Sequence, residues 1–177
     1  MKARQPLSLK GRALQLLAQR DQSRLELRRK LLRHARSAST PALDASGGGD
    51  EDAEAVAEID ALLDWLEANG FVSNERFAES RVHARQSRFG LLRIQSELGR
   101  HRVVLPPELE QSLAASELGR AAAVRARRFA ALPADAAERA RQSRFLLARG
   151  FAPELIHRLM RSLGRAPAEV ANAGTDS

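Results

Sequence analysis

The chain has 177 residues, of which 44% are hydrophobic and 29% charged, so a buried core is expected and general disorder is excluded. Aromatic residues make up only 4% and leucine and alanine dominate the apolar ones, which favours helices over a large sheet. The formal net charge is +7, and the absence of cysteine excludes disulfides and thiolate metal sites.

Apolar residues at helical spacing predict two helices at the start of the chain. The first covers Leu9 to Gln19. The second starts at Ser23, whose spacing to Glu26 matches a capping box, and it runs to about Ala35.

Residues 36–52 are rich in serine, alanine and glycine, and we predict a flexible insertion there. Such a composition cannot bury enough apolar area to offset the entropy of ordering the chain. A third helix is predicted from about Ala53 to Asn69, because Val56, Ile59 and Leu63 repeat at helical spacing. Its expected stop is Gly70-Phe71, where glycine can adopt the left-handed conformation.

Six further helices are predicted from apolar spacing, prolines, a capping-box pattern from Asp135 to Glu138 and a second Gly-Phe stop at Gly150-Phe151. Their approximate ranges are 74–88, 90–98, 107–113, 116–131, 135–149 and 153–163. The hexapeptide Ala-Arg-Gln-Ser-Arg-Phe occurs twice, at 84–89 and 140–145, but its offset disagrees with those of other internal matches. Similar helical units nevertheless follow one another, and short helices must pack against neighbours to bury their apolar faces.

We therefore predict an all-α chain of about nine short helices in tandem three-helix repeats. The expected organisation is an N-terminal tail 1–8, a first unit 9–72 with the flexible insertion 36–52, a second unit 73–115, a third unit 116–165 and a disordered tail 166–177.

The sequence contains no recognisable catalytic or metal-binding motif, so we expect no catalytic residues, no metal and no cofactor. The four histidines are scattered, at His34, His83, His101 and His157. Asp60, Asp64 and Glu67 lie close together on one predicted helix, which favours a solvated acidic face over acid–base chemistry. Catalytic groups can still converge from distant positions, so an enzyme is disfavoured rather than excluded.

The positive charge lies outside the acidic stretch from Asp44 to Glu67, which holds no lysine or arginine. Arginine guanidinium groups form bidentate contacts with phosphate and carboxylate, so such a surface favours a polyanion or an acidic protein face. A GC-rich genome would also enrich arginine, and any single arginine can serve only to keep a face soluble. The predicted partner-binding set is Arg81, Arg85, Arg88, Arg93, Arg100, Arg102, Arg125, Arg128, Arg141 and Arg144.

The aromatic residues favour core packing over a base-stacking platform. Phe71 and Phe151 occupy helix stops, whereas Phe77, Phe89 and Phe129 fall on apolar stripes. No apolar run approaches the roughly 18 residues that span a membrane, and the N-terminus lacks the apolar stretch of a signal peptide. We therefore expect a cytoplasmic protein with no membrane partner.

The order of these signals resembles the RecX family over about Leu9 to Leu163. Arg12 to Leu31 resembles the opening unit of RecX proteins, Trp65 to Ala78 their central signature, and Gly90 to Leu98 their second unit. The chain departs from the family pattern in its long 36–52 insertion and in a third unit blurred by alanine and arginine.

The resemblance implies three three-helix units in an elongated, curved arrangement and no cofactor. We expect the chain to act as a monomer. RecX-like proteins bind along the groove of the RecA–single-stranded DNA filament, limit its growth and dampen its strand-exchange and co-protease activities. The arginine-rich faces would meet RecA or DNA. The alternatives are a free-standing DNA-binding helical module, such as a transcription regulator, and a helical adaptor with no nucleic-acid role.

Overall fold

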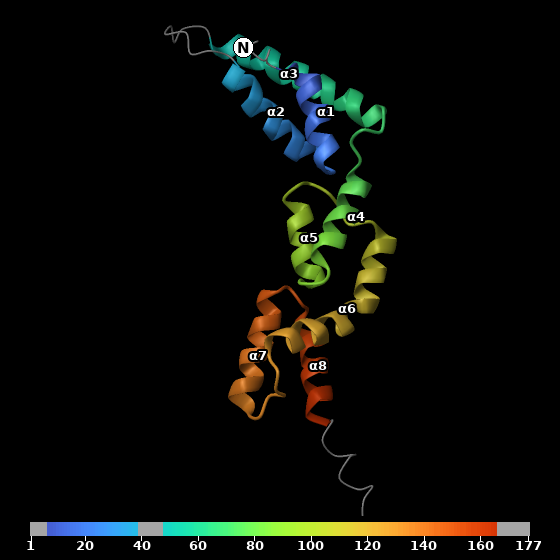
Figure 1. Ribbon diagram of the computed structural model, residues 1–177, viewed down its shortest axis with the longest axis vertical. Coiled ribbons are helices and arrows are strands. Elements are labelled where there is room, and N and C mark those ends of the chain that lie inside the picture. The colour runs from blue at the N-terminus through green and yellow to red at the C-terminus, as the bar shows by residue number, and fades with distance from the viewer. Residues whose placement is uncertain (1–6, 39–47, 166–177) are drawn as a thin grey trace, which may run out of the picture. The chain divides into compact units, whose positions relative to one another are not determined.

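The computed structural model describes residues 7–38 and 48–165, and every regular element in these ranges is an α-helix (Figure 1). The all-α fold class is therefore confirmed. The helices are α1 Leu9–Gln19, α2 Arg24–Ala38, α3 Gly48–Ala68, α4 Asn74–Arg85, α5 Leu91–Gly99, α6 Pro107–Arg128, α7 Ala136–Ala148 and α8 Pro153–Arg165.

Helices α2 and α3 reach further into the segment 36–52 than the sequence predicted, because α2 extends to Ala38 and α3 already begins at Gly48. Residues 39–47, the middle of the predicted flexible insertion, lie outside the described residues. The same holds for residues 1–6 and 166–177, on which the two predicted tails fall.

Helix α6 is one continuous helix where the sequence predicted two, over 107–113 and 116–131. The described residues therefore form eight helices instead of nine. The predicted break falls where the Ser116 hydroxyl donates to the carbonyl oxygens of Ser112 and Leu113 at 3.0 and 3.2 Å. A serine that bonds back to the preceding turn bends a helix without ending it. Figure 1 shows α6 changing direction part-way along its length.

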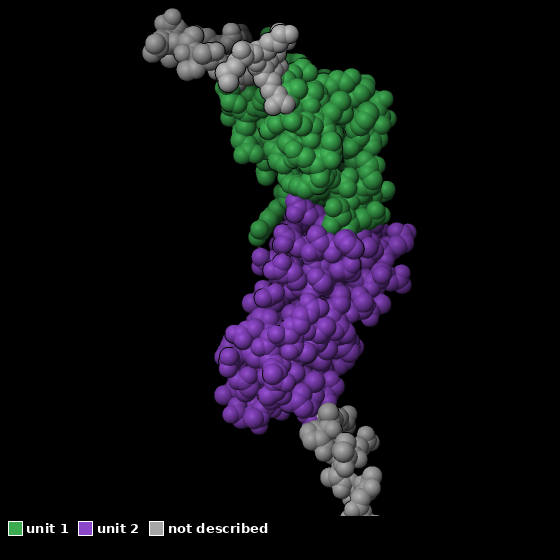
Figure 2. Space-filling view, in the orientation of Figure 1, with its two compact units in different colours: residues 1–80, 100–104 green, residues 81–99, 105–177 purple. Residues whose placement is uncertain are grey.

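The chain divides into two compact units, coloured separately in Figure 2. Unit 1 comprises residues 1–80 and 100–104, and unit 2 comprises residues 81–99 and 105–177. Helix α4 contributes residues to both units.

In unit 1, α2 packs against both α1 and α3. Leu27 and Leu31 of α2 and Leu63 of α3 are completely buried in its core, and burial of each leucine is worth roughly 1.5–3 kcal/mol. Helix α3 ends as predicted: Gly70 has a φ of 72°, and the Phe71 amide donates to the Leu66 carbonyl at 2.8 Å.

In unit 2, α6, α7 and α8 pack against one another. Their core contains Val124 of α6, Leu146 of α7, Ile156 of α8 and the completely buried Phe151. The first turn of α7 is capped as predicted, because the Asp135 carboxylate accepts the Glu138 amide at 2.7 Å.

The start of α5 lies directly against the end of α7. The Gly90 amide donates to the Arg149 carbonyl at 2.9 Å, and the Leu92 amide donates to the Gly150 carbonyl at 3.2 Å. A Cβ atom on Gly90 would lie 2.2 Å from the Gly150 oxygen, so only glycine fits there. Gly150 itself has a φ of 79°, which also favours glycine.

None of the helices in the described ranges combines the length and the apolar character of a membrane span.

Candidate functional site

A group of arginines in unit 2 surrounds the turn 86–90, which connects α4 to α5. The turn presents backbone carbonyl groups just beyond the C-terminus of α4, where the helix dipole attracts cations. Three arginines donate to these carbonyls: Arg120 to Gln86 at 3.0 Å and to Phe89 at 2.9 Å, Arg127 to Ser87 at 3.1 Å, and Arg149 to Arg88 at 3.4 Å. Residues from α6 and from the end of α7 thus converge on one short turn.

The ring of Phe89 gathers further guanidinium groups at the same turn. Four guanidinium carbons lie between 5.4 and 5.9 Å from its centroid, those of Arg85, Arg88, Arg93 and Arg149. Each such contact is worth about 0.5–1 kcal/mol at an exposed site, which offsets part of the repulsion between the cations. The 86–90 arginine cluster, as we call it, consists of these six arginines and of Arg128, which lines one pocket with Ser87 and Arg88 of the turn. Its members are Arg85, Arg88, Arg93, Arg120, Arg127, Arg128 and Arg149.

Within the described residues, Glu97 is the carboxylate that forms ion pairs with this cluster. It lies 3.1 Å from Arg85 and 3.6 Å from Arg93. The buried Glu117 instead accepts the Leu91 amide at 2.8 Å and thereby caps α5. Burial lowers the pKa of Arg120, and the charge of Glu117 opposes this shift. The cluster therefore keeps a large excess of positive charge.

The structure divides the ten predicted arginines by their exposure. Seven are exposed: Arg88, Arg93, Arg100, Arg102, Arg128, Arg141 and Arg144. Arg81 and Arg85 are half-buried. Arg100 and Arg102 belong to unit 1 and the others to unit 2, and Arg102 has a left-handed φ of 56°.

Arg125 does not lie on the surface with the other predicted arginines, because only 5% of it is exposed. Its guanidinium donates to Gln142 Oε1 at 2.7 Å and to the Ala131 carbonyl. Buried polar groups need such partners, so Arg125 ties α6 to α7 and is unsuited to contact a partner.

The predicted set of contact arginines lacks three members of the cluster, namely Arg120, Arg127 and Arg149. Between 31 and 61 residues separate them from the carbonyls of the turn that they bind, so no local spacing could group them. The repeated hexapeptide is the one sequence signal that relates the turn 86–90 to α7. It ends at Phe89 and Phe145, and the Arg149 guanidinium lies over both rings, at 5.6 and 4.9 Å from their centroids.

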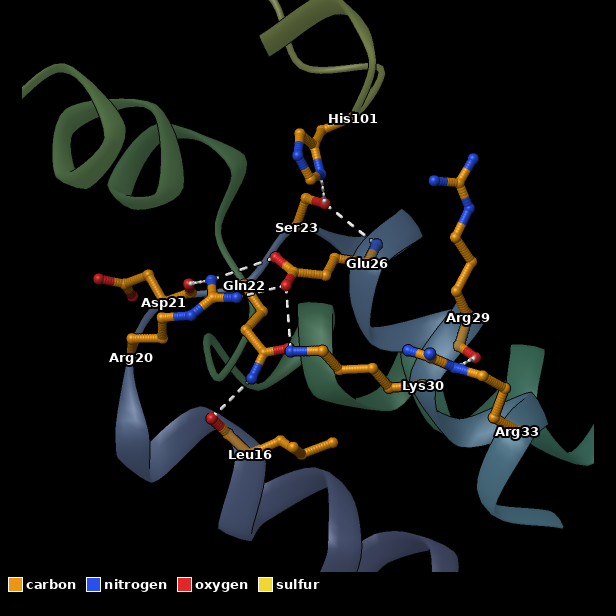
Figure 3. A network of polar contacts seen from close by, with 10 residues as sticks. All are labelled: Leu16, Arg20, Asp21, Gln22, Ser23, Glu26, Arg29, Lys30, Arg33 and His101. Carbon is orange, nitrogen blue, oxygen red and sulfur yellow. Dashed lines mark hydrogen bonds and ion pairs between the residues drawn. The ribbon is translucent and has the colours of Figure 1, made fainter. Parts of the chain in front are cut away.

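Unit 1 holds a separate polar network, which Figure 3 shows from close by. The Glu26 carboxylate pairs with Arg20, and its Oε1 lies 3.0 Å from Lys30 Nζ. Lys30 also donates to the buried Gln22 at 2.8 Å, and Gln22 donates to the Leu16 carbonyl at 2.7 Å. Burial alone would raise the pKa of Glu26, but the hydrogen bonds from Arg20 and Lys30 outweigh it and lower that pKa to about 2.

The same network includes the start of α2. Ser23 caps the helix as predicted, because its Oγ accepts the Glu26 amide at 3.1 Å. The same Oγ lies 3.1 Å from His101 Nδ1, and the His101 ring lies 5.0 Å from that of Phe77. These contacts hold the segment 100–104 against α2 and α4 within unit 1, a structural role.

The acidic residues of α3 pair with arginines of α2. Arg28 binds Asp60 through two hydrogen bonds of 2.6 and 2.9 Å, which lower the pKa of Asp60. Arg24 lies 2.7 Å from both Asp64 and Glu67. These three carboxylates therefore join two helices. Among the described residues, no group of three or more potential ligands is placed to hold a metal ion.

Phe71 contradicts the expected core packing of the aromatic residues. It is 44% exposed and stacks on Trp65, with ring centroids 5.6 Å apart. Lys10 Nζ lies 3.8 Å from the centroid of Trp65. Phe77 and Phe151 are completely buried, as predicted, whereas Phe89 and Phe129 are half-buried.

Comparisons with known proteins identify relatives over most of the chain. The family model for the third three-helix domain of RecX matches residues 115–160. The regulatory protein RecX of Ralstonia nicotianae is 48% identical, over 89% of each chain, and that of Herbaspirillum seropedicae is 47% identical, over 84% of this chain and 86% of its own. The crystal structure of RecX from Lactobacillus salivarius has a TM-score of 0.58 at 17% identity, over 88% of this chain and 94% of that one.

Proposed function

This chain belongs to the RecX family of regulatory proteins, and we propose on that basis that it binds the RecA–single-stranded DNA filament. Binding would mainly inhibit the filament, by limiting its growth, its ATPase, its strand exchange and its co-protease activity. The protein would act by adhesion rather than catalysis, in the cytoplasm, where the filament forms.

The observation that carries this proposal is the 86–90 arginine cluster. Seven guanidinium groups gather around one turn, and within the described residues only Glu97 pairs with them. A nucleoprotein filament offers the complementary charge, because it presents phosphates and acidic protein surface in a repeating array. Several weak contacts along such an array add up to tight binding.

We propose the seven exposed members of the predicted set as the contact residues, together with Arg127 and Arg149 of the cluster. Arg81 and Arg85 would contribute charge from half-buried positions. One of the seven, Arg102, has a left-handed backbone, a conformation that non-glycine residues rarely adopt. The elongated, curved arrangement and the boundaries of the three units stay predictions.

Charge reversal at the cluster tests this proposal. We expect Arg88→Glu combined with Arg93→Glu to raise the concentration that half-inhibits the RecA ATPase on single-stranded DNA by about tenfold or more, because hydrogen bonds to charged groups contribute roughly 1.5–3 kcal/mol each. The assay is steady-state ATP hydrolysis by RecA on a long single strand, titrated with the chain.

The matched control is Arg29→Glu combined with Arg36→Glu. Both arginines are exposed on α2, lie outside the cluster and change the net charge equally. The control should inhibit like the wild-type chain. Equal inhibition by the cluster variant and the wild type, with helical content preserved, would remove the cluster from the mechanism.

A further inference from the structure

We propose that a pocket within unit 2 binds the phosphate backbone of single-stranded nucleic acid directly, without RecA. This inference rests on the proposed function and deepens it, because it names the component of the filament that one part of the arginine cluster contacts. The pocket has a volume of about 260 Å³. It is lined by Ser87, Arg88, Val124, Arg127, Arg128, Phe145 and Arg149.

Two of the four arginines are held in place by the protein itself. Arg127 donates to the Ser87 carbonyl at 3.1 Å, and Arg149 donates to the Arg88 carbonyl at 3.4 Å. Arg149 also lies over the ring of Phe145, 4.9 Å from its centroid. Side chains that are already ordered lose little entropy on binding, so these contacts favour capture of an anion.

The other two arginines, Arg88 and Arg128, are exposed at the pocket. Within the described part of the chain, none of the four arginines forms an ion pair with a carboxylate. Their neighbours in the cluster differ in this respect, since Arg85 and Arg93 both pair with Glu97. Four guanidinium groups around one concavity therefore lack a counter-charge that the protein supplies, and an external anion would provide it.

A nucleic-acid backbone fits the remaining wall of the pocket better than an acidic peptide does. Val124 and Phe145 supply apolar surface beside the guanidinium groups. In a phosphodiester backbone, the carbon atoms of a sugar lie next to each charged phosphate and can contact this apolar surface. In an acidic peptide, flexible side chains carry the charge. Arginine also binds phosphate bidentately, which suits several donors that converge on one group.

The test measures binding of a fluorescently labelled oligothymidine of about 15 nucleotides to the full chain in the absence of RecA. Fluorescence anisotropy reports the binding over a range of salt concentrations. We expect Arg88→Ala combined with Arg128→Ala to weaken binding about a hundredfold, since two charged hydrogen bonds are lost and each is worth a factor of about ten. The slope of log K against log salt should become shallower by about 1.4, because each phosphate contact to a single strand contributes about 0.7.

Arg29→Ala combined with Arg36→Ala is the control, because it removes the same charge from exposed positions outside the pocket. It should change affinity about twofold or less. Equal weakening by the two double variants would reduce the effect to net charge and overturn the proposal. Should the pocket variant lose helicity, the two single alanine variants carry the same test, each with a slope change of about 0.7.

Competitors identify the ligand. Unlabelled oligothymidine should displace the probe, whereas polyglutamate at equal charge and inorganic phosphate at equal phosphate concentration should not. Better displacement by polyglutamate would assign the pocket to an acidic protein, and displacement by inorganic phosphate would assign it to a free anion. Either result overturns the proposal.

The proposed function and this inference fail separately. If the Glu variants of Arg88 and Arg93 lose RecA inhibition while the alanine variants of Arg88 and Arg128 keep full affinity for oligothymidine, the regulation stands and the phosphate pocket does not. If oligothymidine binding depends on the pocket but the wild-type chain does not inhibit RecA, the phosphate pocket stands and the proposed regulation does not.

Discussion

At the scale of single residues, Glu26 makes the stability of unit 1 depend on pH. Its pKa is about 2 in the folded chain, against an ordinary value of 4.5. The unfolded chain therefore binds the proton more readily, and the stability that Glu26 contributes is complete above about pH 4.5 and is lost as the pH falls toward 2.

We expect Glu26→Gln to lower the free energy of unfolding at pH 7 and to flatten its decline between pH 4.5 and pH 2, because the amide cannot titrate. Urea unfolding at several pH values, followed by circular dichroism, measures both effects. Glu58→Gln is the control, since Glu58 is exposed on α3. An unchanged pH dependence in the Glu26 variant would mean that its ion pairs do not contribute.

Arginine has two roles in this chain that sequence spacing cannot separate. Arg125 and Arg128 lie three residues apart on α6, so both were assigned to one basic face, yet the first is buried and the second exposed. The difference arises because Gln142 of α7 and the Ala131 carbonyl accept hydrogen bonds from Arg125. These acceptors are distant in the sequence or in an irregular loop, where periodicity carries no information.

At the scale of elements, the local signals were accurate where they depend on local chemistry. The caps at Ser23 and Asp135 and the left-handed glycines at Gly70 and Gly150 follow from residue type and position alone. The break expected inside α6 was wrong, because nothing in residues 114–116 stops a helix and Ser116 satisfies its hydroxyl within the preceding turn.

Replacing glycine by alanine should change the free energy of unfolding in opposite directions at Gly90, where α5 meets the end of α7, and at Gly119 inside α6. Gly90→Ala should lower the free energy of unfolding by about 2 kcal/mol or more, because its Cβ would overlap the Gly150 carbonyl. Gly119→Ala should raise it by about 0.5–1 kcal/mol, because Gly119 lies inside α6 with open space around it. Thermal and urea unfolding measure both.

The matched pair separates steric overlap from the general effect of replacing glycine. Destabilisation of similar size in both variants would contradict the packing described for α5 and α7. A neutral Gly90 variant would show that the two backbones can move apart.

At the scale of the whole molecule, the sequence predicted the fold class and the family, but it could not assemble the site. The family signature lies in contiguous stretches such as Trp65 to Ala78, where residue order is enough. The 86–90 cluster instead joins one turn to α6 and to the end of α7. Such a site exists only after the helices pack, because its members share no local period.

We propose that this chain regulates by adhering to the RecA–single-stranded DNA filament. Co-sedimentation of the wild-type chain with preformed filaments, compared with the same DNA without RecA at physiological salt, tests it most directly. We expect the chain to sediment with filaments at concentrations where it leaves naked DNA in the supernatant, because RecA adds contacts to those of the phosphates. Equal sedimentation with and without RecA would rule out adhesion to the filament as such and favour a free-standing DNA-binding module.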